Sequence, residues 1–178
     1  TLEGNYFQDD NKDGTQELVF VLRAGFSLSP RRLYEIDIVS QTRIMSENYA
    51  GGFHELLPAD LDQDGRMEYI LPANAIENYP PMDSSKKYND NSAWFVALTN
   101  DLQDVIIDIE FSEGKPHISS CLLEDDSGEV IIIMVSEYSE NRLYLFKYSF
   151  EGELLARREV HQERYIRMLD KTDNVLEN

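Results

Sequence analysis

An acidic turn followed at once by an apolar strand recurs along this 178-residue chain. Residues 9–22 read DDNKDGTQELVFVL, and residues 59–73 read ADLDQDGRMEYILPA. The turn glycines, Gly14 and Gly65, are followed by Gly128 in a degenerate third turn, LEDDSGEV, and by Asn174 at the equivalent place in LDKTDNVLE. A period of roughly 50 residues is typical of repeat folds in which each unit is one supersecondary structure. The chain is therefore expected to contain three units and the start of a fourth.

Each unit has the same order of strand-like segments. A short half-polar segment precedes the acidic turn, at residues 4–8, 53–59, 117–123 and 164–169, and the most apolar segment follows it, at 17–22, 67–73 and 129–135. Two further segments with aromatic or β-branched residues follow at 32–39 and 43–49, 93–99 and 104–111, and 142–150 and 153–160. Continuous apolar runs of this length are typical of strands that are covered on both faces.

Four short antiparallel strands in about 50 residues have the size of one β-propeller blade. We therefore predict an all-β fold with blade 1 at about 4–50, blade 2 at about 51–112, blade 3 at about 115–161 and the first strand of a fourth blade at 162–178. Three blades and one strand do not close a ring of about four to eight blades. The chain is expected either to be part of a larger propeller or to self-associate through its open blade faces.

The first two acidic turns have the spacing of calcium-binding loops. Calcium takes about six to eight oxygen ligands, and side chains at alternate positions followed by glycine wrap such an ion. The predicted ligands are Asp60, Asp62, Asp64, the Arg66 carbonyl and Glu68 in the second turn, and Asp9, Asn11, Asp13, the Thr15 carbonyl and Glu17 in the first. An EF-hand would need a later glutamate and flanking helices, which these turns lack. A solvated turn held by Asx hydrogen bonds is the alternative for each loop.

Composition and motifs narrow the function classes. With 34 acidic and 16 basic residues the net charge is −18, which disfavours nucleic acids and anionic lipid surfaces as partners. The sequence contains no G-x-S-x-G, H-E-x-x-H, C-x-x-C or glycine-rich phosphate loop, so no enzymatic activity is predicted for this segment. The single cysteine, Cys121, excludes an intrachain disulfide, and the longest apolar run, residues 130–135, is too short to cross a bilayer.

One insertion is the predicted partner site. Residues 77–92, ENYPPMDSSKKYNDNS, lengthen the second unit and show no apolar periodicity, so they are expected to form a surface loop. Its aromatic rings and lysines suit an acidic, protein or carbohydrate-like partner. The predicted contact residues are Tyr79, Pro80, Pro81, Lys86, Lys87, Tyr88 and Trp94. The alternative places Trp94 in a blade core and packs the tyrosines locally.

The repeated D-x-[DN]-x-D-G-x-x-E turn, preceded by AGGFHELLPADLD at 50–62, resembles the FG-GAP (VCBS-type) repeats of integrin α-subunit propellers and their bacterial relatives. The resemblance implies one blade per repeat, with structural calcium between the first and second strands. It also implies an extracytoplasmic location, although the first residues carry no signal-peptide pattern.

The function that follows from this resemblance is a non-catalytic recognition, sensor or adhesion module of a larger bacterial protein. An accessory domain of a polysaccharide-degrading enzyme and a purely structural scaffold remain the alternatives.

Overall fold

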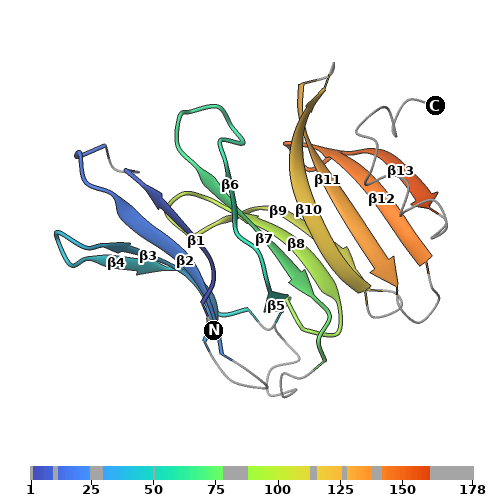
Figure 1. The fold of residues 1–178 in the computed structure, drawn as a ribbon, viewed down its shortest axis with the longest axis horizontal. Coiled ribbons are helices and arrows are strands. Elements are labelled where there is room, and N and C mark those ends of the chain that lie inside the picture. The colour runs from blue at the N-terminus through green and yellow to red at the C-terminus, as the bar shows by residue number, and fades with distance from the viewer. Residues whose placement is uncertain are drawn as a thin grey trace, which may run out of the picture.

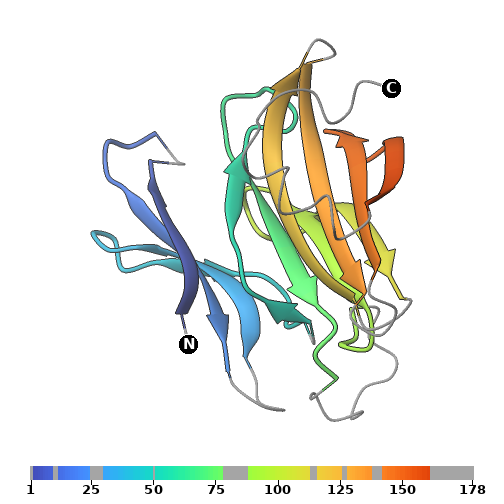
Figure 2. The ribbon, with the colours of Figure 1, turned by 45° about the vertical axis from the view of Figure 1, so that its right-hand side comes forward.

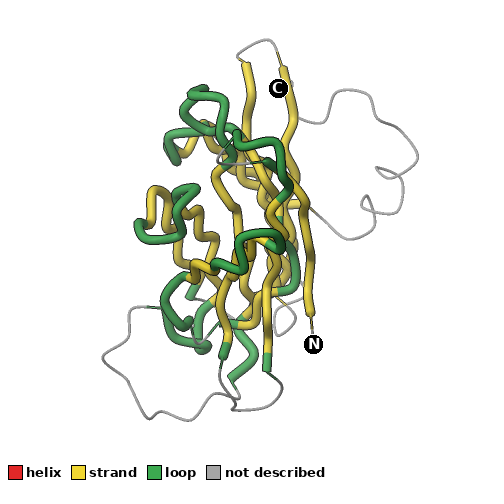
Figure 3. The backbone as a smooth tube through the Cα atoms, turned by 90° about the vertical axis from the view of Figure 1, so that its left-hand side faces the viewer, coloured by secondary structure: helices red, strands yellow, loops and turns green. Residues whose placement is uncertain are grey.

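Every regular element of the protein is a β-strand in the computed structural model, which describes residues 2–9, 12–24, 30–49, 51–77, 88–112, 116–125, 128–137 and 142–160 (Figure 3). The predicted all-β class is therefore confirmed. Within those ranges no helix has the length and apolar character that crossing a membrane requires. The strand predicted at 164–169 lies outside the described residues.

The strands form three separate antiparallel sheets, which lie side by side in Figure 1. Sheet A contains β1 (Leu2–Gln8), β2 (Glu17–Arg23), β3 (Arg31–Asp37) and β4 (Arg43–Met45). Sheet B contains β5 (Gly52–Phe53), β6 (Leu57–Ala59), β7 (Glu68–Asn74), β8 (Ala93–Leu98) and β9 (Val105–Phe111). Sheet C contains β10 (Pro116–Asp125), β11 (Gly128–Glu137), β12 (Arg142–Ser149) and β13 (Leu154–Val160). Consecutive strands pair in sheets A and C, and none of the three described sheets closes on itself.

The first strand of sheet B is interrupted, whereas the sequence predicts one strand over 53–59. Phe53 pairs with Ala73 and Leu57 pairs with Ile70. The three residues 54–56 therefore lie opposite only two residues of β7. One of those two is Pro72, which has no amide hydrogen to donate to a ladder. The chain therefore forms two short strands, β5 and β6, that both pair with β7.

Sheet B is covered on both faces, which explains why its sequence is apolar without alternation. All six residues of β8 and the first six of β7 are buried. The core between sheets A and B contains Val19, Val21, Leu33, Tyr49, Phe53, Tyr69, Leu71, Ala73, Trp94, Val96, Leu98 and Leu102. The core between sheets B and C includes Ile70, Phe95, Ala97, Ile107, Ile118, Ile131, Ile133, Val135, Tyr144, Phe146 and Tyr148. Figure 2 shows the resulting order, with the green strands of sheet B between the other two sheets.

Polar contacts also join sheets A and B. The Gln8 side-chain amide donates a hydrogen bond to the Tyr69 hydroxyl, which connects β1 to β7. The guanidinium of Arg31, on β3, lies 3.9 Å from the carboxylate of Asp90, and both side chains are buried. These contacts fix the two sheets relative to each other, and with them the two acidic loops.

The far face of sheet A has no sheet packed against it among the described residues. On β2, Leu18, Phe20 and Leu22 alternate with the buried residues and are half-buried. The Phe20 ring stacks on the Tyr34 ring at a centroid distance of 5.4 Å, and Phe7 on the same face is 50% exposed. An apolar sheet face of this kind is typical of a surface that another layer covers.

Candidate metal centre

The two acidic loops, which begin at Asp9 and Asp60, share two hydrogen bonds from backbone amides to carboxylates. The carboxylates of Asp9 and Asp60 accept from the amides of Gly14 (2.9 Å) and Gly65 (3.0 Å). Asp13 and Asp64 likewise accept, each at 2.8 Å, from the amide two residues further on. Both glycines have positive φ, 89° and 84°, which a side chain at that place would strain. The sequence repeat is therefore a repeat of loop structure.

The loops occupy equivalent places in their sheets. Gln8 pairs with Glu17 across the first loop, and Ala59 pairs with Glu68 across the second, so each loop joins a first strand to the apolar strand beside it. The loops also lie near each other, because the Lys12 ammonium is 3.8 Å from where a Cβ on Gly65 would stand. A cationic side chain of one loop thus already reaches the other acidic loop.

The second loop gathers three carboxylates. One oxygen each of Asp60, Asp62 and Glu68 lie within 4.8 Å of one another. Glu68 is only 5% exposed, and its Oε2 accepts a hydrogen bond of 2.8 Å from the Leu61 amide. Asp60 Oδ1 is buried and has no hydrogen-bond partner among the described residues. Oxygen ligands that point together in this way are the set that hard divalent cations prefer.

The charged neighbours that shift the pKa of Glu68 are all negative. Burial raises the pKa of Glu68 above its usual value, and the negative charges of Asp62, Asp64 and Asp60 raise it further, against the lowering effect of the Leu61 amide. A buried carboxylate surrounded by like charges is destabilised in its ionised form. A bound cation would remove that cost, so the residues present fit a metal ion.

The first loop forms a different cluster from the one predicted. One carboxylate oxygen each of Asp13, Glu17 and Asp37 lie within 4.8 Å of one another, whereas both oxygens of Asp9 accept amide hydrogens of the loop. Asp37 is absent from the sequence prediction because it ends β3, far from the turn in sequence. It joins the cluster because it pairs with Glu17 across the β2–β3 hairpin.

Asp37 is held by its own turn. Its carboxylate accepts hydrogen bonds from the amides of Val39 (2.7 Å) and Ser40 (3.0 Å). Hydrogen bonding to Ser40 lowers its pKa, so it remains ionised at neutral pH. The equivalent residue of sheet B is Thr99, since the amides of Asp37 and Thr99 each bond to the carbonyl five residues ahead. The two sites therefore differ by one carboxylate.

The third unit has no comparable loop. Asp125 pairs with Gly128, which leaves only two residues between β10 and β11. The residue equivalent to Thr99 is Ser149, and its partner on β11 is Val130 in place of a glutamate. A two-residue hairpin connection without this glutamate does not provide the ligands that the first two loops offer.

The remaining predicted ligands are placed as follows. Asp64 bonds to the Arg66 amide and is not in the three-carboxylate cluster. Thr15 donates both its amide and its hydroxyl to Asp13. These contacts involve the amides of Thr15 and Arg66, so the predicted carbonyl ligation stays a prediction. Asn11 lies outside the described residues.

The predicted partner site is only partly described, and its tryptophan lies elsewhere. Trp94 is 3% exposed in the core between sheets A and B, where its indole donates to the Asn89 carbonyl at 2.9 Å. It packs in the core because β8 is covered on both faces, so it does not present a contact surface. Tyr88 packs edge-on against Tyr49 and Trp94, and its hydroxyl donates to Asp108 at 3.1 Å. Tyr79, Pro80, Pro81, Lys86 and Lys87 lie outside the described residues.

Comparison of the chain with protein-family models, with curated proteins and with solved structures gives no match.

Proposed function

We propose that this chain is a non-catalytic, calcium-binding β-propeller segment that serves as a recognition, sensor or adhesion module of a larger extracytoplasmic protein. The observation that carries the proposal is the pair of acidic loops with one hydrogen-bond pattern, each next to a buried glutamate, Glu17 at 1% and Glu68 at 5% exposure. A turn that only needed to be solvated would have no reason to bury these carboxylates beside other acids.

Calcium is the cation that this donor set suits best. The clusters supply carboxylate oxygens, with loop carbonyls and water available to complete six to eight ligands, whereas zinc sites usually contain cysteine or histidine. Outside the cell calcium is abundant enough for sites with dissociation constants of about 10⁻⁴ to 10⁻³ M. An extracytoplasmic location therefore agrees with the chemistry of the loops.

Calcium binding is tested by thermal unfolding in calcium and in a chelator. Calcium at about 100 times its dissociation constant stabilises the native state by about 2.7 kcal/mol per site, which raises the melting temperature. Asp62→Ala should remove the contribution of the second site. The control is Asp104→Ala, which deletes the same charge at an exposed position outside both clusters. Equal melting temperatures in calcium and chelator would refute the proposal.

The propeller assignment is supported by the stacking of the three sheets. Sheets A and B pack through one apolar core and sheets B and C through another, and sheet A keeps an apolar far face. We propose that a further four-stranded sheet of the same kind, from the parent protein or a second copy, covers that face. The test is sedimentation of the isolated chain and of its Phe20→Ser variant. If both are monomers at all concentrations, a second copy does not cover this face.

A further inference from the structure

A pocket of about 270 Å³ lies between sheets B and C. Its lining comes from the last residues of β9 and β11 and from the inner faces of β12 and β13. The acidic loops are at the other end of the strands, where β7 begins and β8 ends. The pocket is therefore a separate site from the candidate metal centre.

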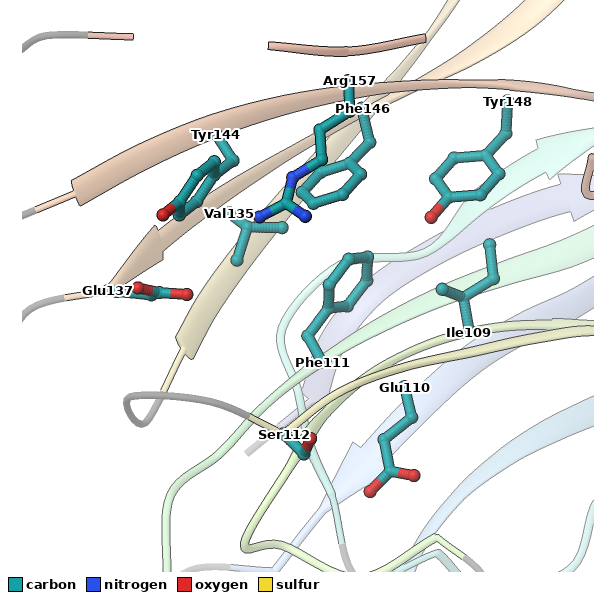
Figure 4. A pocket seen from close by; sticks show the side chains of 10 residues that line it. All are labelled: Ile109, Glu110, Phe111, Ser112, Val135, Glu137, Tyr144, Phe146, Tyr148 and Arg157. Carbon is teal, nitrogen blue, oxygen red and sulfur yellow. The ribbon is translucent and has the colours of Figure 1, made fainter. Parts of the chain in front are cut away.

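Aromatic side chains form its walls. Phe111, from sheet B, packs edge-on against Phe146, from sheet C, at a centroid distance of 5.2 Å. Tyr144 and Tyr148 flank Phe146 on β12, and both line the pocket. Figure 4 shows the Phe111 and Phe146 rings next to each other at one side of the pocket, and the Tyr148 hydroxyl on the pocket side of its ring. These flat apolar surfaces suit a planar or ring-shaped ligand.

One cation lies over these rings. The guanidinium carbon of Arg157, on β13, is 4.7 Å from the Tyr144 ring centroid and 5.3 Å from that of Phe146. Among the described residues Arg157 makes no hydrogen bond and no ion pair, and the side chain is exposed. Its planar group of N–H donors therefore remains available to solvent or to a ligand with two acceptor oxygens.

Two acids, Glu110 and Glu137, also line the pocket. Glu110 accepts a hydrogen bond of 2.6 Å from the Ser92 hydroxyl, and Figure 4 shows its carboxylate directed away from Arg157. Glu137 is the last residue of β11, and its backbone pairs in register with that of Arg142. Among the residues that line the pocket, Arg157 is the one cation, beside the two acids.

We propose that this pocket binds a small molecule consisting of one six-membered ring and one carboxylate. The carboxylate pairs with the Arg157 guanidinium through two parallel hydrogen bonds, and the ring lies against Phe111, Phe146 and Tyr148. The volume is below that of pockets for drug-sized ligands, which fits a single ring. Hexuronic acids and aryl carboxylates share this chemistry. The pocket would give the recognition role proposed above a ligand, but it needs no calcium.

The test uses D-glucuronate and benzoate as probes, with D-glucose and benzamide as their uncharged counterparts. Binding to the full chain is measured by ligand-observed NMR and calorimetry, in calcium and in chelator, so that this proposal and the calcium proposal fail separately. Arg157→Met removes the charge and keeps an apolar stem. Arg158→Met is the matched control, because the adjacent residue on a strand points to the opposite face.

At least one acid should bind while its uncharged counterpart does not, and the pair that binds identifies the sugar or the aryl source. Arg157→Met should weaken binding about 10- to 100-fold, the range for a hydrogen bond between charged groups, and Arg158→Met should not. Arg157→Lys keeps the charge but cannot form two parallel hydrogen bonds, so it should bind with intermediate affinity. This variant also provides the test if Arg157→Met fails to fold. Failure of both acids to bind, or equal binding by wild type and Arg157→Met, would overturn the proposal.

Discussion

Replacing Glu68 by glutamine should change stability in opposite directions with and without calcium. In chelator, Glu68 lies within 4.8 Å of two other carboxylates, and each pair of unit charges at that distance repels by about 0.9 kcal/mol in water and about 3.5 kcal/mol at an effective dielectric constant of about 20. Asp62 is exposed, so the lower limit is the better guide, and Glu68→Gln should stabilise the metal-free protein by about 2 kcal/mol. Glutamine keeps an oxygen to accept the Leu61 amide.

Calcium reverses this order. At about 1,000 times the dissociation constant, a bound ion stabilises wild type by about 4.1 kcal/mol at the second site, and the variant loses most of that because it lacks a carboxylate ligand. Wild type should then be more stable than Glu68→Gln by about 2 kcal/mol. The first site contributes equally to both proteins and cancels in the comparison.

Urea unfolding followed by fluorescence of Trp94, the only tryptophan and a buried one, measures both differences. Glu129→Gln makes the same chemical change at an exposed position of sheet C and should show neither effect. The electrostatic reasoning is refuted if Glu68→Gln is less stable than wild type in chelator. It is also refuted if the difference in stability between the two proteins has the same sign in chelator and in calcium.

The pH dependence has a defined sign. The folded-state pKa of Glu68 is raised above its ordinary 4.5, so the folded protein binds this proton more tightly than the unfolded chain does. In chelator, wild type is expected to have a smaller free energy of unfolding than Glu68→Gln at pH 7. This difference should shrink as the pH falls from 7 toward 4.5. In calcium the advantage of wild type should also shrink, because protonation removes a ligand.

Five further substitutions test the fold and the sites. Asp37→Asn should weaken calcium binding at the first loop, and Thr99→Asp should strengthen it at the second by supplying the equivalent carboxylate, both measured by calorimetry. Gly65→Ala, at φ 84°, should cost about 1 kcal/mol or more in urea unfolding because the left-handed region disfavours a side chain. Phe95→Ala should cost about 3 to 5 kcal/mol, since Phe95 is fully buried, whereas Phe7→Ala at 50% exposure should cost far less.

The strand pattern was largely predictable because the apolar runs are local. Continuous runs such as residues 69–71 indicated strands buried on both faces, and the structure confirms this for sheet B. The break at residues 54–56 was missed because it depends on Pro72 in the neighbouring strand, which only the register reveals. The strand predicted at 32–39 ends at Asp37, since residues 38–40 form a turn held by the Asp37 carboxylate, and the strand predicted at 43–49 ends at Met45.

The candidate sites were predictable only where their residues are close in sequence. The acidic turns are local motifs, so the sequence names Asp60, Asp62 and Glu68, whose carboxylates lie together in the structure, while metal binding by them stays a prediction. Asp37 required the register of the β2–β3 hairpin, in which Glu17 faces it. A β2–β3 hairpin with its connection at residues 24–30 places Glu17 opposite Asp37. The sequence would therefore have predicted this pair if the connection had been located there. Arg157 and its aromatic pocket depend on the packing of two sheets, which no spacing in the sequence encodes.

The position of sheet B between two apolar cores also sets the order in which the molecule opens. Amide hydrogens of β7 and β8 are shielded by a sheet on each side, so they exchange with solvent only after a neighbouring sheet has detached. Sheets A and C each have one such neighbour among the described strands, so either can separate while the other stays packed on sheet B. Glu17 leaves with sheet A, whereas Glu68 is fixed to the last sheet to open. On the proposed calcium assignment, the first loop is expected to release its ion before the second as denaturant rises.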